Sequence, residues 1–376
     1  MVNQRADVVV AGAGIIGASC AYRLAERGLS VAVLEASSTF ASGSTGKSAA
    51  GVRVQFSEPL NVMLSWQSIQ EYQEMPAAGY RPIGYLFLVP PDQWEAHYQS
   101  AVMQKELGVP VEVLGLEAVR RIISFSPHGL AGATFGPADG VVDPHGITQE
   151  YIRWARARGA EFHFDVPLLQ ASRSGGLWRV DTPLGKFEAG FIVNAAGAWA
   201  GQLALRAGLS VPVRPSRRMV FSTATLKTLH AYPLTIDLST GFYLRSEGER
   251  LLLGMSNPNE KEGFVEGIDW SWMETCLEAG LSRFPWLSET ALDAKASWWG
   301  YYEVTPDHNP ILGLMPGTQG FVNACGFSGH GVQQAAMVGK LIAEEIVDGR
   351  AHTLDIDPFR YQRFEREPSA KERNIV

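Results

Sequence analysis

Residues 8–35 read VVVAGAGIIGASCAYRLAERGLSVAVLE, and this stretch decides the fold of the N-terminal part of the chain. The β-branched run at residues 8–10 predicts a strand that is buried on both faces. Ile16, Cys20 and Leu24 recur every four residues, which is typical of one face of a helix. The glycines between these two patterns therefore lie on a strand-to-helix turn.

The glycine spacing predicts a dinucleotide site. Gly12 permits the tight turn, Gly14 lets a pyrophosphate approach the helix N-terminus, and Gly17 lets helix and strand pack closely. Glu35 ends the second apolar run, where its carboxylate can accept hydrogen bonds from ribose hydroxyls and its charge disfavours a 2′-phosphate. A plain turn is the alternative, but a strand, a helix, a second strand and an acid that follow one another at the expected spacing favour the dinucleotide site.

Length and composition limit the classes of protein. The 376 residues, 46% of them hydrophobic, can fill two lobes, and the net charge of −7 comes without a basic stripe. We therefore expect neither nucleic acid nor an anionic membrane as a partner. Cys20, Cys276 and Cys325 are odd in number and widely spaced, so we expect no disulfide framework and no metal site, and a cytoplasmic location. No run is apolar for the length of a membrane span.

Periodicity predicts further elements along the chain. Short β-like runs between residues 210 and 300 indicate an antiparallel sheet, and the pair at Leu184 and Gly185 indicates a hairpin. Helices are expected over 58–75, over 92–107, in a stretch that ends at Gly159, over about 270–283, and in a last stretch closed by Gly349.

Four glycine-bearing elements are spread over some three hundred residues: GAGIIG at 12–17, SGSTGKSAAG at 42–51, VNAAGAW at 193–199 and GFSGHGVQQ at 326–334. Their order and their residues resemble those of the D-amino-acid oxidase superfamily of FAD enzymes, in particular the branch of sarcosine oxidase and the proline dehydrogenase β-subunit. The resemblance runs from residue 8 to about residue 348. It is most specific in SWWGYYEVTPDHNPILG from Ser297 and ACGFSGHG from Ala324.

The resemblance implies an α/β fold, α+β overall, with two domains. A Rossmann-like FAD-binding domain is expected from residues 1–80, 140–210 and 305–376. A substrate-binding domain built on an antiparallel sheet is expected from residues 81–139 and 211–304.

The resemblance also implies where FAD binds. The first glycines would take the pyrophosphate, Glu35 the ribose and Val166 the adenine, while the loop 42–51 would follow the ribityl chain. Residues 326–333 would place a helix N-terminus beneath the flavin, where its partial positive charge stabilises the reduced ring. The expected cofactor-binding residues are Gly12, Gly14, Ile15, Ile16, Gly17, Glu35, Ala36, Ser42, Ser44, Thr45, Ser48, Ala49, Ala50, Gly51, Val166, Ala196, Gly197, Trp199, Gly300, Gly326, Gly329, His330, Gly331, Val332 and Gln333.

Arg53 is the residue most clearly indicated for the substrate. In the sarcosine-type branch an arginine at this position grips the substrate carboxylate, and a bidentate guanidinium would fix one C–H bond toward the flavin. A surface arginine is the alternative. Tyr243 and His330 are the other candidate catalytic residues, although Tyr243 equally fits an ordinary packed aromatic. Trp298, Tyr302 and Gln333 are expected to contact substrate, since alternate aromatics of residues 298–302 face opposite sides of a strand.

The chain departs from the patterns of this superfamily at four positions, three of them relative to the sarcosine-type branch. Gly300 stands where covalently flavinylated members have a cysteine, so FAD is expected to be noncovalent. Gln333 replaces a lysine that assists with the carboxylate, and Leu252 falls near the lysine credited with promoting the reaction with oxygen. Tyr302 stands where glycine and D-amino-acid oxidases carry their carboxylate arginine, which disfavours that branch.

The expected activity is oxidation of the C–N bond of a secondary amine or N-substituted α-amino acid, of the sarcosine, proline or N-alkyl amino acid type. Hydride transfer to flavin N5 gives an imine, and the electrons pass to oxygen, giving hydrogen peroxide, or to another acceptor such as a second subunit or a quinone. The alternatives are a D-amino acid or glycine oxidase, a non-catalytic flavin-binding subunit, and an NAD-dependent dehydrogenase.

Overall fold

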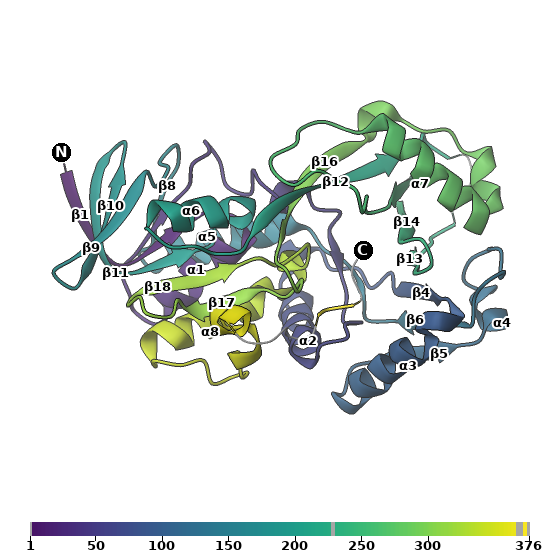
Figure 1. The fold of residues 1–376 in the computed structure, drawn as a ribbon, viewed down its shortest axis with the longest axis horizontal. Coiled ribbons are helices and arrows are strands. Elements are labelled where there is room, and N and C mark those ends of the chain that lie inside the picture. The colour runs from purple at the N-terminus through teal and green to yellow at the C-terminus, as the bar shows by residue number, and fades with distance from the viewer. Residues whose placement is uncertain (1, 227–229, 366–370, 374–376) are drawn as a thin grey trace.

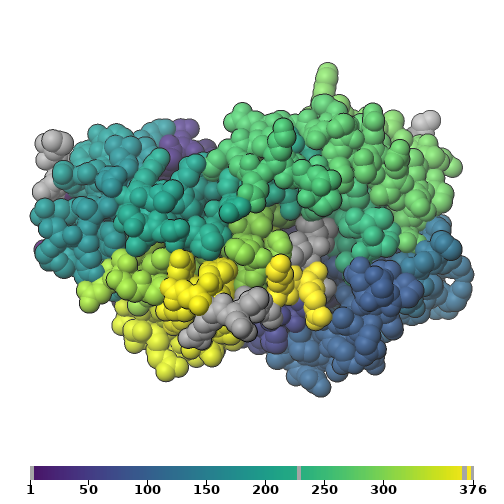
Figure 2. All heavy atoms as spheres, in the orientation of Figure 1, coloured from purple at the N-terminus to yellow at the C-terminus, as the bar shows by residue number. Residues whose placement is uncertain are grey.

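The computed structural model describes residues 2–226, 230–365 and 371–373 of the chain. Two large sheets account for most of its strands, and they lie toward opposite ends of an elongated molecule (Figure 1). The N-terminal strand belongs to the left-hand sheet in this view, and strands from the middle of the chain form the right-hand one. The space-filling view shows that the blue and green segments, far apart in sequence, together form the right-hand end (Figure 2).

The first sheet has the order β17-β18-β11-β1-β2-β8, with β10 and β9 attached beside β11. β1 pairs in parallel with both β2 and β11, and β11 pairs in parallel with β18. Residues 8–10 of β1 are completely buried, as their β-branched run predicts. The strands are β1 (Val2–Ala11), β2 (Val31–Leu34), β8 (Glu161–His163), β9 (Gln170–Ser174), β10 (Leu177–Thr182), β11 (Gly185–Asn194), β17 (Ile311–Leu314) and β18 (Phe321–Cys325).

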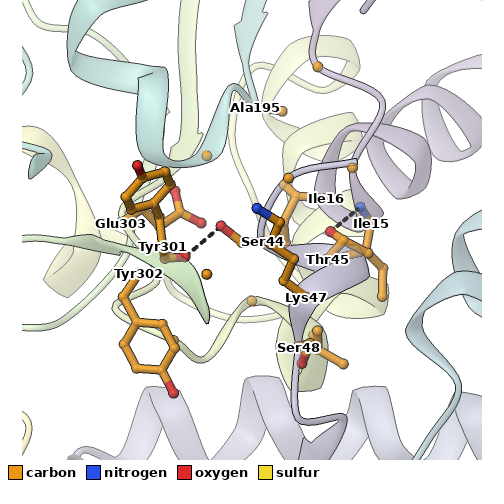
Figure 3. Close-up of a pocket in the computed structure, with 18 of the residues that line it drawn as sticks. Ile15, Ile16, Ser44, Thr45, Lys47, Ser48, Ala195, Tyr301, Tyr302 and Glu303 are labelled. Atoms are coloured by element: carbon orange, nitrogen blue, oxygen red, sulfur yellow. Dashed lines mark hydrogen bonds between the residues drawn. The ribbon is translucent and has the colours of Figure 1, made fainter. Parts of the chain in front are cut away.

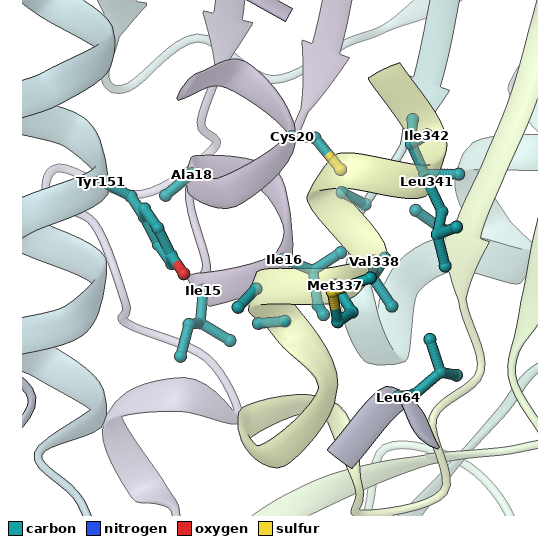
Figure 4. Packing of buried hydrophobic residues seen from close by; sticks show 14 of the residues in the cluster. Ile15, Ile16, Ala18, Cys20, Leu64, Tyr151, Met337, Val338, Leu341 and Ile342 are labelled. Atoms are coloured by element: carbon teal, nitrogen blue, oxygen red, sulfur yellow. The ribbon is translucent and has the colours of Figure 1, made fainter. Parts of the chain in front are cut away.

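Helices pack against this sheet and against one another. α1 (Ile15–Glu26) lies between α5 (Pro144–Arg156) and α8 (Gly331–Val347), and α8 also packs on α2 (Pro59–Gln73). Figure 4 shows Ile16 and Cys20 of α1 beside the apolar side chains of α8. The periodic apolar face predicted for this helix is therefore buried, and most of the rest of α1 is buried as well. The short α6 (Ala200–Arg206) follows β11.

The second sheet has the order β16-β12-β15-β14-β13-β4-β6-β5. It is antiparallel, as predicted, except that β13 pairs in parallel with β4. These two strands come from distant parts of the chain, so no tight hairpin forces them to run in opposite directions. The strands are β4 (Tyr85–Val89), β5 (Glu112–Leu114), β6 (Gly132–Gly136), β12 (Arg214–Ser222), β13 (Leu234–Asp237), β14 (Phe242–Glu247), β15 (Arg250–Gly254) and β16 (Trp298–Val304).

Shorter elements complete the described fold. α3 (Pro91–Glu106), α4 (Leu116–Val119) and α7 (Trp270–Arg283) accompany the second sheet, and β3 (Gly51–Val52) pairs with β7 (Gly140–Val141). The 3-10 turns are η1 (Thr45–Lys47), η2 (Pro76–Ala78), η3 (Gly197–Trp199), η4 (Pro285–Glu289), η5 (Ala294–Ala296), η6 (Asp357–Phe359) and η7 (Tyr361–Glu365). None of the helices in the described ranges is long and apolar enough to cross a lipid bilayer.

Every strand of the first sheet lies within residues 2–34, 161–194 or 311–325, and every strand of the second within 85–136 or 214–304. We propose that the two sheets mark the cofactor-binding and substrate-binding domains. The chain crosses between them several times, so a site between the sheets draws residues from distant parts of the sequence.

Candidate cofactor and substrate site

A cavity of about 680 Å³ is lined by residues of both sheets. Its walls include the turn between β1 and α1, the loop 42–51, the end of β11, strands β12, β14 and β16, and the start of α8. The sequence-predicted residues that line it are Gly12, Gly14, Ile15, Ile16, Glu35, Ala36, Ser42, Ser44, Thr45, Ser48, Ala49, Ala50, Gly51, Arg53, Ala196, Gly197, Trp199, Tyr243, Gly300, Tyr302, Gly329, His330, Gly331, Val332 and Gln333.

The glycine turn at one end of the cavity has no room for side chains. Gly12 has a φ of +108°, and a Cβ added there would lie 2.5 Å from the carbonyl oxygen of Ala195. A Cβ on Gly17 would lie 1.9 Å from the carbonyl oxygen of Gly12. The turn therefore brings bare backbone to the start of α1, which is the geometry that a pyrophosphate needs.

Glu35 is held at the end of β2 by two backbone amides. Its Oε2 accepts a hydrogen bond from the N–H of Ala13 at 2.7 Å, and its Oε1 accepts one from the N–H of Ser37 at 2.9 Å. The carboxylate thus faces the glycine turn and lines the cavity. This is the place where an acid accepts from the ribose hydroxyls of a dinucleotide.

The loop 42–51 connects the two halves of the cavity. The hydroxyl of Thr45 accepts a hydrogen bond from the N–H of Ile15 at 3.1 Å, and the hydroxyl of Ser44 donates one to the carbonyl oxygen of Tyr301 at 2.6 Å (Figure 3). The loop therefore runs from the glycine turn to β16, along the path predicted for the ribityl chain. Beyond it, Gly329, His330 and Gly331 place the N-terminus of α8 in the wall of the cavity. A cavity of this volume, bordered by the glycine turn, Glu35 and the N-terminus of α8, fits FAD.

Four of the predicted residues do not line the cavity. Gly17 packs on the glycine turn instead. The N–H of Val166 donates to the carbonyl oxygen of Glu35, and its neighbours Pro167 and Leu168 line the cavity. Gly326 donates its N–H to the carboxylate of Glu303 at 2.7 Å, behind the wall.

Trp298, which the sequence predicts to contact substrate, is the fourth residue that does not line the cavity. Its indole N–H donates to the carbonyl oxygen of Lys47 at 2.9 Å, which holds the ring against the outer side of the loop. Figure 3 shows the rings of Tyr301 and Tyr302 leaving β16 in opposite directions. Strand alternation is thus as expected, but the position of Trp298 at the start of β16 puts it beyond the cavity.

Arg53 is buried in the wall of the cavity, with only 4% of its surface exposed. Its guanidinium donates to the carbonyl oxygen of Gln55 and lies 4.0 Å from the centre of the Phe56 ring. Burial lowers the pKa of Arg53, while the negative charge of Glu372 opposes this shift. An arginine stays protonated under these conditions, so the cavity contains a buried cation.

Gln333, which stands where the sarcosine-type branch has a lysine, holds the backbone of Arg53 in place. The side-chain oxygen of Gln333 accepts a hydrogen bond from the backbone N–H of Arg53 at 2.8 Å. Both residues are buried and both line the cavity. The first turn of α8 therefore fixes the strand segment that carries the arginine.

His330 and two tyrosines complete this end of the cavity. Burial, together with the positive charge of Arg53, holds the pKa of His330 well below its usual range, so the imidazole is neutral. Its ring meets Phe56 edge to face, with 4.9 Å between ring centres. Burial raises the pKa of Tyr243 and of Tyr302, so both phenols are protonated and can donate hydrogen bonds.

Several lining residues carry no clear signal in the sequence. Tyr85 lies in an apolar run that is typical of a core strand, and Arg218 is one of two adjacent arginines in β12. Glu303 lies between the predicted Tyr302 and the turn that follows. Alternation places the two adjacent arginines on opposite faces of β12, but which of them faces the cavity depends on the pairing of β12 with β16.

Glu303 should make stability depend on pH. Burial raises its pKa to about 7, although the hydrogen bond from Gly326 opposes the shift. Because the folded state favours the protonated acid, this contribution to stability is present at about pH 4 and is lost as pH rises through about 7, by as much as about 3 kcal/mol. Glu303→Gln keeps an acceptor and removes the charge, so it should raise the melting temperature of the FAD-loaded protein more at about pH 8 than at about pH 5.

Asp139 has a similarly raised pKa, also about 7, but it titrates in both proteins, so the comparison isolates Glu303. An equal difference between variant and wild type at the two pH values would contradict the assignment.

The described residues contain no group of three or more histidines, cysteines or acids that could hold a metal ion. The parallel strands β18, β11, β1 and β2, the bare glycine turn, the acid after β2 and the cavity beside them together define a dinucleotide-dependent enzyme of the FAD-binding class. Residues 7–345 match the family model described as FAD dependent oxidoreductase, and the chain belongs to this family. Its cofactor is FAD.

The chain is similar over most of its length to several known proteins. It is 30% identical to FAD-dependent oxidoreductase domain-containing protein 1 of Bos taurus, covering 99% of this chain and 87% of that protein. It is 28% identical to mitochondrial dimethylglycine dehydrogenase of Homo sapiens, where 96% of this chain matches 45% of the longer relative. The crystal structure of L-proline dehydrogenase from P. horikoshii superposes with a TM-score of 0.89 at 26% identity, covering 98% of this chain and all of that one.

Proposed function

We propose that this protein oxidises the C–N bond of a secondary amine or N-substituted α-amino acid with FAD as the immediate acceptor. The observation that carries the proposal is that Arg53, a buried cation, lines the same cavity as the glycine turn and Glu35. When bound, FAD accepts a hydride at N5, which leaves an imine as the product. The protein has to hold the substrate so that one C–H bond faces that atom.

Arg53 would take the carboxylate of the substrate. A guanidinium offers two parallel N–H donors, and a site with low dielectric strengthens the pair. Tyr243 and Tyr302 present protonated hydroxyls to the same end of the cavity and would orient the carboxylate or the amine. Because an amine must be neutral for its neighbouring carbon to lose a hydride, the positive charge of Arg53 favours the reactive form by disfavouring a protonated amine nearby.

The names of the relatives support this class of reaction. The similar proteins include dehydrogenases of dimethylglycine and of L-proline, and the human sarcosine dehydrogenase is 28% identical over 98% of this chain. These substrates share a carboxylate and a substituted nitrogen. Gly300 offers no sulfur for a covalent bond to the flavin, so we propose that FAD is held noncovalently.

The test is a panel of amino acids mixed anaerobically with the FAD-loaded protein while flavin absorbance is followed. N-methylglycine, N-methyl-L-alanine and L-proline represent the proposed class, and glycine and D-alanine represent primary amines. Bleaching by the first group supports the proposal, and bleaching by the second group alone would contradict it. Mixing the bleached samples with air-saturated buffer then shows whether oxygen is the acceptor, or whether a second subunit or a quinone must take the electrons.

A further inference from the structure

Arg218 is a further arginine in the wall of the cavity, which Arg53 and Arg206 also line. It lies on β12 opposite Gly300 of β16, on the face that carries Val220 into the same cavity. Its Nη1 donates to the hydroxyl of Ser216 at 2.7 Å and to the carbonyl oxygen of Arg217 at 2.9 Å. Both acceptors are neutral, so neither balances the charge of Arg218.

The other arginines of β12 have acidic partners. Arg217 faces away from the cavity and pairs with Glu260 at 3.0 Å, and Arg214 pairs with Glu262. Among the residues that the structure describes, no carboxylate lies within ion-pair distance of Arg218, and its buried Nε has no hydrogen-bond partner. A half-buried cation that forms no ion pair is costly, even though the charge of Glu260 acts on Arg218 from further away, and an anionic ligand would relieve that cost.

Tyr302 lies near both Arg218 and Arg53. The guanidinium of Arg218 lies 5.1 Å from the centre of the Tyr302 ring. Burial raises the pKa of Tyr302, and the charges of Arg218 and Arg53 both oppose that shift. The two cations therefore act on one region of the cavity, although they come from β12 and from the segment after β3.

We propose that Arg218 binds a second anionic group of the substrate, so that the preferred substrate is an N-substituted amino acid with two carboxylates. Arg53 would hold one carboxylate beside the reacting carbon, and Arg218 would hold the other, either on the side chain or on the nitrogen substituent. This inference rests on the proposed function and narrows its substrate class.

Matched substrates test the inference by kinetics. N-methyl-L-aspartate differs from N-methyl-L-alanine by one carboxylate, and N-(carboxymethyl)glycine is matched in the same way by N-ethylglycine. We expect kcat/KM to favour the dianion of at least one pair, and Arg218→Gln to reduce that preference by about 30-fold or more. Arg218→Lys keeps the positive charge but loses the two parallel N–H donors, so it should retain part of the preference for the dianion. Arg214→Gln, on the same strand but exposed, should leave the preference as it is.

A binding measurement separates this inference from the proposed function. Succinate and butyrate are redox-inert under these conditions, and each can be titrated into the FAD-loaded protein while the flavin spectrum is recorded. We expect succinate to bind at least 10-fold more tightly than butyrate, and Arg218→Gln to abolish that difference. Equal binding of the two acids, or a preference that survives in Arg218→Gln, would overturn the inference even if amino acids are oxidised. A flavin spectrum or reduction potential that shifts in Arg218→Gln without any change in preference would assign Arg218 to the cofactor and would also overturn it.

Discussion

Replacing Arg53 with glutamine is expected to lower kcat/KM for an N-methyl amino acid by about 10³-fold, or about 4 kcal/mol of transition-state stabilisation. Each charge-assisted hydrogen bond to a buried guanidinium is worth about 1.5–3 kcal/mol, and a bidentate clamp loses two. The loss should fall on the substrate and not on FAD, because the arginine lies beyond the loop 42–51 that we assign to the cofactor. Steady-state kinetics with a dye acceptor, together with the flavin content of the purified variant, measures both.

Arg53→Lys is the matched variant for this prediction. It keeps a positive charge but loses the two parallel donors, so it should recover only part of the lost activity. Arg81→Gln is a control for charge, since Arg81 is largely exposed and does not line the cavity. An Arg53→Gln protein that binds FAD normally and keeps kcat/KM within about threefold of wild type would show that this arginine does not hold the substrate.

Replacing Gly12 with alanine is expected to weaken FAD binding by about 100-fold, or about 3 kcal/mol. The new Cβ would lie 2.5 Å from the carbonyl oxygen of Ala195, and a φ of +108° is itself unfavourable for alanine. The backbone at the start of α1 would have to shift away from the pyrophosphate. Titration of the deflavinated protein with FAD, followed by quenching of flavin fluorescence, gives the dissociation constant.

Gly28→Ala is a control that separates the effect of backbone strain from the effect of a steric clash in the glycine turn. Gly28 also has a positive φ, of +82°, but a Cβ there would meet no other atom within 4 Å. This variant should lose some stability and keep its affinity for FAD. Equal loss of FAD affinity in the two variants would mean that strain alone explains the result, and normal affinity in Gly12→Ala would contradict the assignment of the turn.

The N-terminal strand, turn and helix follow from the sequence because their signals are local. The buried run at residues 8–10, the helix face of Ile16, Cys20 and Leu24, and the bare turn at Gly12 depend on residues that are close together in the chain. The loop 42–51 and the start of α8 also line the cavity. The resemblance to a family predicts where such distant loops lie, which no local pattern of residues can do.

The wall made by the second sheet could not be predicted in the same way. Whether Arg217 or Arg218 faces the cavity depends on the pairing of β12 with β16, which joins residues that lie 78 to 90 positions apart in the chain. The hydrogen bond of Trp298 to Lys47, a residue of the distant loop 42–51, likewise leaves Trp298 outside the lining of the cavity. A run of alternating aromatics predicts which residues share a face of the strand, but it does not predict which residues of that face reach the cavity.

The most direct test of the proposed function is anaerobic reduction of the bound flavin by N-methyl-L-alanine. Purified protein loaded with FAD is mixed with the amino acid in the absence of oxygen, and absorbance of the flavin near 450 nm is followed, with dithionite as the control for full reduction. We expect complete bleaching by the amino acid at a rate that saturates with its concentration, and bleaching by L-proline or N-methyl-L-aspartate if the pocket prefers a ring or a second carboxylate. A protein that binds FAD and is bleached by dithionite, but by none of these substituted amino acids, would contradict the proposed function.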